Sequence, residues 1–299
     1  MTENEIISTF NEFLVKYDMR AGVATICTLL KQLKLYKYST IAELSENLRS
    51  TSKLILQNDD VIGTACISST SELFQRHITL ENEVLEASDF EEVQSVLVEK
   101  GEQFLDELLV HSRKKIVQLS LPFINDGVTI LTHSKSSTVE QVLSYAKDSN
   151  KNFNVFVTQS MPNESGSKMV EILKEKNIPA IMILDAAVTH VMDQVDIVLL
   201  GAEGIAANGG LINKIGTYQI CMAAKYLNKP VYVVAEKIKF NKIFPLNQED
   251  VQKSFGSSQK DKYPRVDYTP PDLVDLLITD LGVLTPSSVT EVRFKLQLN

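Results

Sequence analysis

The sequence predicts an α/β protein with a helical N-terminal domain over residues 1–120 and a doubly wound parallel-sheet domain over residues 121–299. Two observations carry this prediction. The first part of the chain has apolar residues at helical spacing and no clear strand pattern. From Asp126 onward, short apolar runs alternate with helical stretches, which is typical of a parallel sheet covered by helices on both faces.

The N-terminal part carries two local signals besides its apolar stripes. Ser39 or Thr40 can cap a helix, because Glu43 stands at the offset of a capping box. Apolar residues at helical spacing also run through residues 90–120, and Pro122 follows them. We therefore expect one long helix that leads from the helical domain into the second domain.

The second part alternates between two kinds of pattern. Short apolar runs predict strands at residues 128–132, 153–158, 180–184, 195–200 and 231–235, and residues 276–279 are a candidate sixth strand. The predicted helices between them cover residues 137–147, 165–176, 186–193 and 213–227. Residues 240–271 are polar and irregular, so we expect a long surface loop there.

Composition limits the function classes. The 299 residues are 44% hydrophobic and carry a net charge of −8, which disfavours a basic nucleic-acid-binding face. No apolar run approaches the roughly 20 residues of a membrane span, and the acidic N-terminus is unlike a signal peptide. Cys27, Cys66 and Cys221 lack metal-ligand or disulfide spacing. We expect a cytosolic protein with no metal, nucleic-acid or membrane partner.

A glycine-rich stretch follows the predicted strand at residues 195–200. Asn208, Gly209 and Gly210 precede the predicted helix at residues 213–227, with Asn213 and Lys214 at its start. Backbone N–H groups at a helix N-terminus bind anions, so this turn is a candidate phosphate site. The alternative is that the glycines only make a tight connection between strand and helix.

Polar residues also follow four of the predicted strands directly. The carboxyl ends of parallel strands meet at one edge, so residues 132–137, 158–160, 185–187 and 201–204 should line one pocket. Its hydroxyls, amides and lysines suit a small phosphorylated polyol. No GxGxxG or P-loop motif is present. His133 and Ser134 are adjacent on a strand and point opposite ways, so by themselves they form no catalytic dyad.

Several segments in fixed order carry a family resemblance: ILTHS, VTQSMPNESG, LDAAVTHVMDQVD, GAEGIAANGGLINKIGTY, FPLNQEDV and TDLGVLTPSSV. The chain resembles the initiation factor 2B family, and within it the alpha regulatory subunits of the exchange factor that reloads initiation factor 2 with GTP. The middle segments are shared with isomerases of methylthioribose 1-phosphate and ribose 1,5-bisphosphate. The resemblance implies a Rossmann-like second domain.

The isomerases use a cysteine and an aspartate for proton transfer, and both differ here. Ser134 stands at the cysteine position and Glu203 at the aspartate position. A serine hydroxyl is a poor proton shuttle without a dedicated base, and a displaced carboxylate slows catalysis steeply. The resemblance thus implies that this chain has no catalytic residue. It also implies that the sugar-phosphate pocket is retained, and this pocket is the one ligand site that we expect. Its expected residues are Arg20, His133, Ser134, Lys135, Ser136, Thr158, Asp185, Glu203, Asn208, Gly209, Gly210, Asn213 and Lys214.

One of these assignments has an open alternative, and two other positions near the pocket depart from the family pattern. Arg20 matches an isomerase phosphate contact, and its alternative is a surface residue at a helix start. Gln159 stands where relatives tend to have glutamate, and Ser137 where arginine is common. These departures concern which ligand the pocket binds.

The resemblance also implies partners. We expect a homodimer formed through the second domains, which bridges the other subunits of the exchange factor and helps to sense the phosphorylated alpha subunit of initiation factor 2. Thr40, Glu43, Phe74 and Arg76 are candidates for that contact, and core packing is the alternative for Phe74. Two other hypotheses are a cytosolic sugar-phosphate isomerase with an altered acid/base pair and a stand-alone sugar-phosphate sensor.

Overall fold

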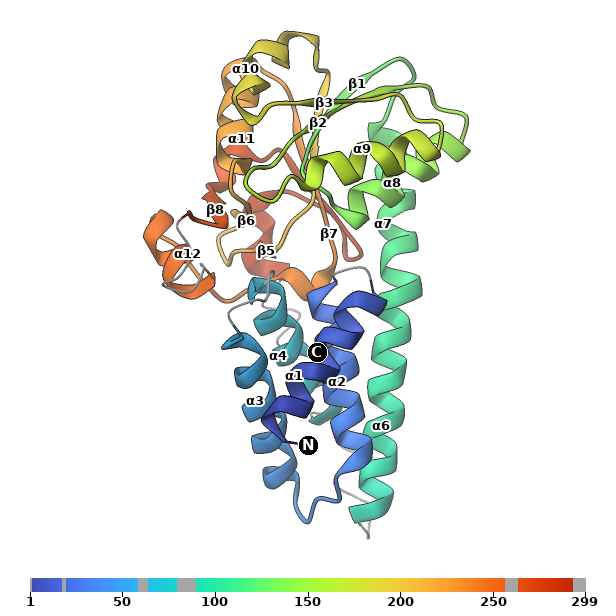
Figure 1. Ribbon diagram of the computed structural model, residues 1–299, viewed down its shortest axis with the longest axis vertical. Coiled ribbons are helices and arrows are strands. Elements are labelled where there is room, and N and C mark those ends of the chain that lie inside the picture. The colour runs from blue at the N-terminus through green and yellow to red at the C-terminus, as the bar shows by residue number, and fades with distance from the viewer. Residues whose placement is uncertain (1, 18–19, 59–63, 80–89, 256–262, 293–299) are drawn as a thin grey trace. The chain divides into compact units, whose positions relative to one another are not determined.

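A computed structural model describes residues 2–17, 20–58, 64–79, 90–255 and 263–292. The chain forms two compact units, Met1–His111 and Ser112–Asn299 (Figure 1). The first unit is helical and the second is built on a mostly parallel sheet, so the predicted fold class is confirmed.

The helical unit is organised around one buried helix. Its elements are α1 (Glu3–Lys16), α2 (Ala21–Leu35), α3 (Ile41–Leu56), α4 (Thr64–Thr79) and α6 (Phe90–Asp106). Helix α2 contacts α1, α3, α4 and α6 and buries residues around its whole circumference, including Val23, Ile26 and Leu29. A helix that is apolar on all sides takes the central position of a bundle.

Polar caps fix where two of these helices begin. Thr2 and Glu5 form a reciprocal capping box at α1. At α3, the Thr40 hydroxyl accepts a hydrogen bond from the Glu43 backbone N–H at 3.1 Å. The Glu43 carboxylate accepts from the Ser39 N–H at 2.8 Å. The predicted cap therefore forms, with Thr40 as the capping residue.

The long helix predicted over residues 90–120 is present in three consecutive parts. Helix α6 continues into a π-helical segment, Glu107–Ser112, and then into α7 (Arg113–Ser120). A 3-10 turn over Leu121–Phe123, which contains Pro122, ends the run. The division between the two units falls within the π-helical segment, between His111 and Ser112.

The second unit contains a seven-stranded sheet in the order β10-β9-β7-β4-β1-β2-β3. All neighbours are parallel except β9 and β10. All six predicted strands are present, and β10 is an additional antiparallel strand at the edge. The strands are β1 (Thr129–His133), β2 (Asn154–Thr158), β3 (Ala180–Ile183), β4 (Ile197–Leu200), β7 (Val231–Ala235), β9 (Leu276–Thr279) and β10 (Gly282–Leu284).

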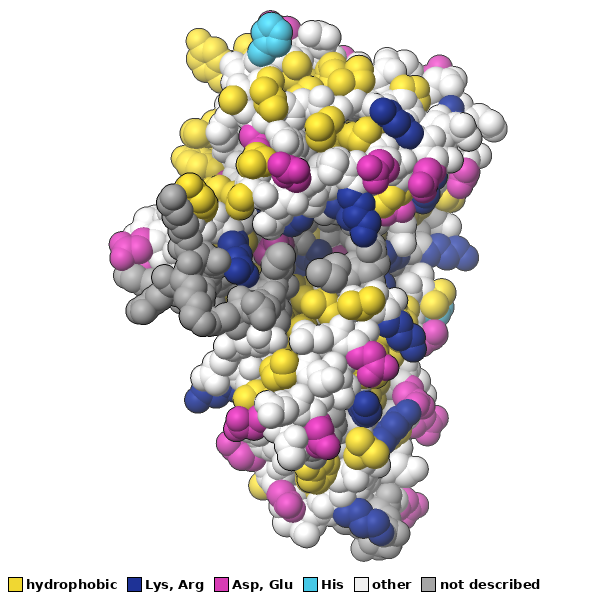
Figure 2. Space-filling model, viewed as in Figure 1, with side chains coloured by type: hydrophobic (Ala, Val, Ile, Leu, Met, Phe, Trp, Pro, Cys, Tyr) yellow, Lys and Arg dark blue, Asp and Glu magenta, His cyan; other side chains and the backbone are white. Residues whose placement is uncertain are grey.

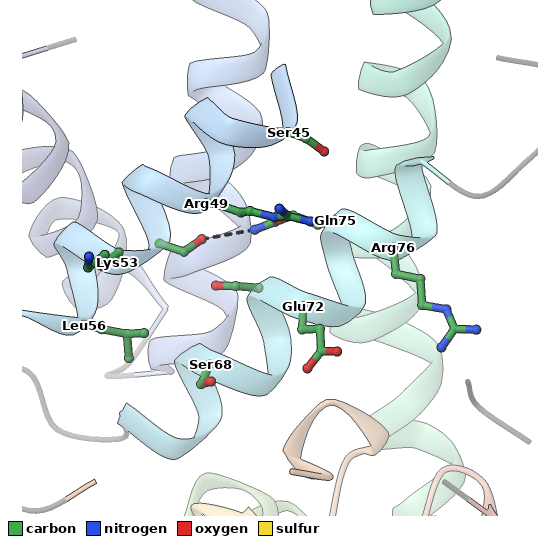
Figure 3. Close-up of a pocket in the computed structure, with 10 residues that line it drawn as sticks. Ser45, Arg49, Lys53, Leu56, Ser68, Glu72, Gln75 and Arg76 are labelled. Atoms are coloured by element: carbon green, nitrogen blue, oxygen red, sulfur yellow. Dashed lines mark hydrogen bonds between the residues drawn. The ribbon is translucent and has the colours of Figure 1, made fainter. Parts of the chain in front are cut away.

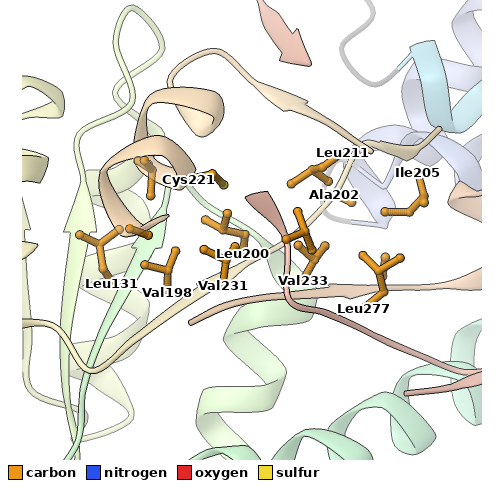
Figure 4. Packing of buried hydrophobic residues seen from close by; sticks show 14 of the residues in the cluster. Leu131, Val198, Leu200, Ala202, Ile205, Leu211, Cys221, Val231, Val233 and Leu277 are labelled. Carbon is orange, nitrogen blue, oxygen red and sulfur yellow. The ribbon is translucent and has the colours of Figure 1, made fainter. Parts of the chain in front are cut away.

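Both faces of this sheet are buried, and successive residues of a strand enter different cores. Leu131, Val198 and Leu200 belong to one apolar cluster, part of which Figure 4 shows. Ile130 and Leu199, which alternate with them, belong to the other cluster. This explains why the strands read as continuous apolar runs rather than alternating ones. The covering helices are α7, α8 (Ser137–Asp148), α9 (Ser165–Glu175), the short α10 (Val188–Val191) and α11 (Thr217–Tyr226).

Two sequence predictions were wrong around residue 213 and beyond residue 240. The predicted helix at residues 213–227 begins only at Thr217, because Leu211–Lys214 forms strand β6. The stretch predicted as a loop contains α12 (Gln248–Phe255) and β8 (Val266–Thr269). Strands β5 (Gly204–Ile205), β6 and β8 pair antiparallel in a second, small sheet. These strands are too short and too polar to give a readable pattern.

One edge of the large sheet exposes apolar side chains. In the edge strand β3, Ile181 is 61% exposed and Met182 is 45% exposed, and Leu184 directly after it is 63% exposed. Figure 2 shows hydrophobic side chains gathered at the β3 and α10 end of this unit. A hydrophobic edge strand normally requires cover. We call Ile181, Met182 and Leu184 the β3 patch.

The three cysteines are free thiols. Cys27, Cys66 and Cys221 are all buried. Burial raises the pKa of Cys27, and it raises the pKa of Cys221 to about 12. Helical and sheet packing alone therefore hold the fold without a disulfide.

Candidate functional site

The site lies where the parallel strands end. The register pairs His133 of β1 with Thr158 of β2, and Thr158 with Ile183 of β3. The residues after these strands are therefore brought to one edge of the sheet, as the sequence predicts for parallel strands. Strand β6 of the small sheet adds Lys214 to the same place, because its amine bonds to Ser134.

His133 is a buried member of this cluster. Its Nε2 lies 2.9 Å from the Ile215 carbonyl oxygen and its Nδ1 lies 2.6 Å from the Thr158 hydroxyl. A carbonyl only accepts, so Nε2 carries the proton and donates it, while Nδ1 accepts from Thr158. Burial lowers the pKa of His133 to about 4, against the opposing field of Asp185. His133 is thus a neutral group that ties β1 to β2 and to the chain before α11.

Ser134 and Lys214 form the polar centre of the cluster. Ser134 has a left-handed backbone with φ of 62°. Lys214 Nζ donates to Ser134 Oγ at 2.7 Å and to Ser165 Oγ at 3.2 Å, and the two hydroxyls are 2.6 Å apart. Burial lowers the pKa of Lys214, and the nearby Glu203 carboxylate opposes that shift. We call Ser134, Ser165 and Lys214 the lysine cluster.

Glu203 is a half-buried carboxylate on which several cations act. Burial raises its pKa, while the positive charges of Lys214, Lys239 and Arg265 lower it. Lys239 also lies 3.7 Å from the Glu236 carboxylate, so two acids share this cation. A site near several cations attracts anions.

Asp267 is a functional candidate that the sequence analysis missed. Its Oδ2 accepts from the Gly216 N–H at 2.7 Å and from the Tyr218 N–H at 3.0 Å, so it caps α11. Its Oδ1 is buried without a hydrogen-bond partner among the described residues. Burial raises the pKa of Asp267 to about 7, against these backbone bonds. The residue lies in β8, within the stretch that the sequence predicted to be a loop.

The predicted phosphate turn at Asn208 is not followed by a helix. A strand, not a helix, follows Gly210, so no helix N-terminus faces this turn. A Cβ on Gly209 would lie 2.1 Å from the Pro286 carbonyl oxygen, and one on Gly210 would lie 2.4 Å from the Tyr268 ring. Asn208 Nδ2 donates to the Tyr268 hydroxyl at 2.6 Å. The predicted helix start after this turn is therefore wrong, and the glycines allow close packing of a tight turn. A ligand contact by Asn208, Gly209 or Gly210 stays a prediction.

Three other predicted site residues have defined structural partners. Ser136 caps α8, where its hydroxyl accepts from the Val139 N–H at 3.4 Å. The Asp185 carboxylate accepts from the Ser160 and Met161 N–H groups, each at 2.8 Å. Asn213 Nδ2 donates to the Thr217 hydroxyl at 3.2 Å. These bonds hold the loops around the lysine cluster, and a ligand contact by these residues stays a prediction, as it does for Lys135.

Five predicted residues belong to the helical unit, and one prediction about them was wrong. Phe74 is fully buried and packs edge-on against Phe104, with ring centroids 5.9 Å apart, so it cannot contact a partner directly. Thr40 and Glu43 lie exposed at the start of α3. Arg20 is the residue before α2, and its predicted contact with a ligand stays a prediction.

Arg76, the last of the predicted partner residues, lines a groove of about 560 Å³ between α3 and α4. Figure 3 shows Arg49 of α3 extending toward Gln75 of α4, with Lys53 further along α3. Three cations and one acid line this groove. The sequence analysis did not identify Arg49 or Lys53, which lie on a helix face that reads as ordinary solvated surface.

Among the described residues, no group of three or more His, Cys, Asp or Glu side chains is arranged to hold a metal ion. None of their helices is both long and apolar enough to cross a membrane.

The polar residues at the strand ends are His133, Ser134, Ser165, Glu203 and Lys214, and we call them the strand-end cluster. The fold defines an α/β protein with a helical N-terminal unit and a Rossmann-like, mostly parallel sheet. The model of the initiation factor 2 subunit family matches residues 15–286. The chain belongs to this family.

Relatives match over different lengths. The chain is 38% identical to translation initiation factor eIF2B subunit alpha of Dictyostelium discoideum, covering 97% of this chain and 96% of the relative. It is 34% identical to the subunit of the same name in Caenorhabditis elegans, over 100% of both chains. Ribose 1,5-bisphosphate isomerase of Archaeoglobus fulgidus is 33% identical over 66% of each chain.

Solved structures share the fold. A chain of the tetrameric eIF2B-beta2-delta2 complex from C. thermophilum superposes with a TM-score of 0.79 at 22% identity, covering 98% of this chain and 95% of that chain. The translation initiation factor eIF-2B of Pyrococcus horikoshii OT3 superposes with a TM-score of 0.71 at 22% identity, covering 89% and 90%. Both helical and α/β units thus recur in other members of the fold.

The buried His133 predicts a specific dependence of stability on pH. Its pKa of about 4 lies below its ordinary value of 6.5, so the unfolded chain binds the proton more tightly. Between pH 6.5 and 4 this group should therefore destabilise the fold as the pH falls, by about 3 kcal/mol in total. In His133→Asn, the difference in unfolding free energy from the wild type should shrink by that amount from pH 7 to pH 4, measured by urea denaturation.

The comparison with a variant is necessary because Asp267, with a raised pKa, changes stability in the opposite direction over the same range. Asp267 is present in both proteins, so its contribution cancels. His190→Asn removes an exposed histidine and is the matched control. A difference for His133→Asn that stays constant from pH 7 to pH 4 would contradict a buried, neutral His133.

Proposed function

We propose that the chain is a non-catalytic regulatory subunit, of the alpha type, of the guanine-nucleotide exchange factor for initiation factor 2. The observation that carries this proposal is the length of the matches. Two alpha subunits match the chain from end to end, while the isomerase relative matches about two thirds. Ser134 and Glu203 support it, because the isomerase cysteine and aspartate are both replaced.

In this proposal the subunit works in the cytosol as a homodimer that joins the other subunits. The β3 patch supports a dimer interface, because it is an exposed apolar edge on the α/β unit. A second copy would bury Ile181, Met182 and Leu184 and remove an edge that otherwise invites aggregation. The likeness to a chain of a tetrameric eIF2B complex is consistent with an assembly of several subunits.

The helical unit is the proposed sensor of the phosphorylated alpha subunit of initiation factor 2. Thr40 and Glu43 are exposed at the start of α3, and Arg76 lines the groove between α3 and α4. Binding of the phosphorylated form to this unit would inhibit exchange and slow translation under stress. Phe74 contributes to this surface only indirectly, because it is buried where α4 packs on α6.

The strand-end cluster is the proposed site for a sugar phosphate that acts as a structural or regulatory ligand. Lys214, Lys239 and Arg265 all lie close enough to Glu203 to lower its pKa, and a cluster of cations attracts a phosphate group. The lysine cluster offers an amine and two hydroxyls to the ligand. No other cofactor is proposed.

The second candidate function is a sugar-phosphate isomerase with an altered acid/base pair. The 33% identity to a ribose 1,5-bisphosphate isomerase and the polar, buried strand-end cluster favour it. Against it, the Ser134 hydroxyl is bonded to a lysine that donates, so no base is poised to take its proton.

Affinity purification of the tagged chain from its own cells at moderate salt tests the proposed function. The four other subunits of the exchange factor should come with it in near-equal amounts, identified by mass spectrometry. Double substitution of Glu43→Gln and Arg76→Gln should leave this assembly intact and weaken the binding of phosphorylated initiation factor 2, because glutamine at position 43 can still cap α3. Recovery of the chain without any initiation-factor subunit would contradict the proposal.

The proposed dimer can be tested on the purified chain by light scattering. Ile181→Asp with Leu184→Asp should convert a dimer into a monomer, because a dimer would bury two carboxylates on the β3 patch. Val15→Asp with Leu35→Asp is the matched control, since these residues are 78% and 62% exposed in the helical unit. A dimer that survives the first pair of substitutions would rule out this surface as the interface.

The pocket is tested by binding and turnover of ribose 1,5-bisphosphate and methylthioribose 1-phosphate. Lys214→Met should weaken sugar-phosphate binding about tenfold or more through loss of a charge-assisted bond, while Lys225→Met, at an exposed site, should not. The wild type should show no turnover at ordinary enzyme rates, of roughly 1 per second or faster. Such turnover, in comparison with Ser134→Cys/Glu203→Asp, would favour the isomerase instead.

A further inference from the structure

Asp267 holds the turn that carries Lys214 into the strand-end cluster. Its Oδ2 accepts hydrogen bonds from the Gly216 N–H at 2.7 Å and from the Tyr218 N–H at 3.0 Å, at the start of α11. In the pairing of β6 with β8, Asp267 stands opposite Asn213, the residue directly before Lys214. The Asp267 carboxyl group therefore lies against the same short turn that presents the Lys214 amine.

The two oxygens of this carboxyl group have different surroundings. Oδ2 receives both backbone donors, whereas Oδ1 is buried and makes no hydrogen bond with any described residue. The Asp267 residue is 5% exposed, so water reaches it little. A charged carboxylate is costly in such a place, while a proton on Oδ1 removes the charge and leaves Oδ2 to accept both bonds. The geometry thus allows Asp267 to be protonated without losing its cap on α11.

Glu203 is the acid whose charge acts on Asp267. Burial raises the pKa of Asp267 to about 7 against the backbone N–H donors, and the negative charge of Glu203 raises it further. Glu203 differs from Asp267, because the positive charges of Lys214, Lys239 and Arg265 offset its burial and lower its pKa. Of these two acids, Asp267 is therefore the one that changes its protonation near neutral pH.

The other titratable neighbours keep one protonation state near pH 7. On α11, burial and then the charge of Asp267 raise the pKa of Cys221 to about 12. On β1, His133 lies against the same turn, since a Cβ on Gly216 would be 3.3 Å from its Cε1, and burial lowers the pKa of His133 to about 4. Helix α12 contacts β8 through the neutral Gln248 amide. A charge change in this neighbourhood near pH 7 therefore falls on Asp267.

We propose that the strand-end cluster binds its anionic ligand together with a proton from solvent, which Asp267 takes up on Oδ1. A phosphate group beside Lys214 brings negative charge to a site that already contains the Glu203 and Asp267 carboxyl groups. Like charges favour the neutral form of an acid, so the ligand strengthens the hold of Asp267 on its proton. The coupling is reciprocal, and protonated Asp267 strengthens ligand binding by the same factor.

This inference rests on the sugar-phosphate site proposed above and adds a regulation to it. Because ligand and proton favour each other, the ligand should bind more tightly as the pH falls from 8 to 7. The occupancy of the strand-end cluster would then report the acidity of the surroundings as well as the concentration of the ligand.

The test is a calorimetric titration of the full chain with ribose 1,5-bisphosphate at pH 7.5, in Tris and in Hepes. The two buffers differ in their heat of ionisation, so the difference between the measured heats gives the number of protons taken up. The wild type should take up about half a proton more than Asp267→Asn. The comparison at one pH removes the protonation of the ligand itself, which is the same for both proteins.

The pH dependence of the affinity gives a second readout. From pH 7 to pH 8, ribose 1,5-bisphosphate should bind the wild type about threefold to fivefold more weakly. Asp267→Asn should change less than about twofold, because asparagine stays neutral and its oxygen still accepts the two N–H bonds of α11. The matched control is Asp196→Asn, which removes an aspartate that accepts the Thr129 N–H at 2.8 Å at the amino ends of the strands. This control should behave as the wild type does.

A third measurement examines the free chain. In protein labelled with ¹³C at the aspartate carboxyl carbons, one wild-type resonance that is absent from Asp267→Asn should titrate near pH 7, while ordinary aspartates titrate near pH 4. Ribose 1,5-bisphosphate should move that titration to higher pH. This wild-type titration also decides the question if Asp267→Asn does not fold.

The adverse outcomes differ in meaning. Equal proton uptake by the wild type and Asp267→Asn would overturn the inference and leave the proposed pocket intact, and so would titration of every aspartate below pH 5 in the free chain. Loss of the uptake in Glu203→Gln but not in Asp267→Asn would assign the proton to Glu203 and overturn the inference as well. If ribose 1,5-bisphosphate did not bind at all, the proposed pocket would be contradicted, and the inference with it.

Discussion

The half-buried ammonium group of Lys214 forms the polar junction between the two sheets of the α/β unit. It comes from the small antiparallel sheet and bonds to Ser134 after β1 and to Ser165 at the start of α9. A buried amine is costly unless hydrogen bonds and an opposite charge compensate it, and Glu203 supplies that charge. The second sheet is therefore held against the ends of the parallel strands by polar contacts, where most other contacts between layers are apolar. His133 reinforces the same junction through the Ile215 carbonyl.

Much of the fold could be predicted from the sequence, because long apolar periodicities dominate it. The parallel strands are uninterrupted apolar runs in the sequence because both of their faces are buried. The apolar pattern of the long helix continues to Pro122, where the helix ends. Strands β6 and β8 could not be predicted, because Asn213, Lys214 and Asp267 interrupt any apolar run in them. The π-helical segment could not be predicted either, because Glu107–Ser112 has the composition of an ordinary α-helix. Apolar periodicity in a sequence indicates which residues are buried. These elements form instead because of strand pairing and capping hydrogen bonds, which leave no such pattern.

The site could be predicted less well than the fold, for a related reason. Residues at strand ends, such as His133, Ser134 and Thr158, follow directly from the topology of a parallel sheet. The helix start after Asn208 and Gly209 was misjudged because a glycine turn looks the same in sequence whether a helix or a strand follows it. Phe74 was misjudged because an aromatic residue on an amphipathic helix serves a core as readily as an interface. Ser165 and Asp267 were missed because only three-dimensional neighbours reveal their partners.

The burial of every cysteine has a consequence for how the molecule meets oxidising conditions. The thiolate is the form that peroxides and electrophiles attack, and burial raises the pKa of both Cys27 and Cys221. Cys66 is shielded within α4, and the strand end that holds a cysteine in the isomerase pattern holds Ser134. Oxidants and alkylating reagents thus meet no reactive sulfur from cysteine in the folded chain. Oxidants would instead meet exposed thioethers, among them Met182 in the β3 patch, which is 45% exposed. Oxidation there would make an apolar edge polar, so an oxidative change in this protein falls on that surface and not on its thiols.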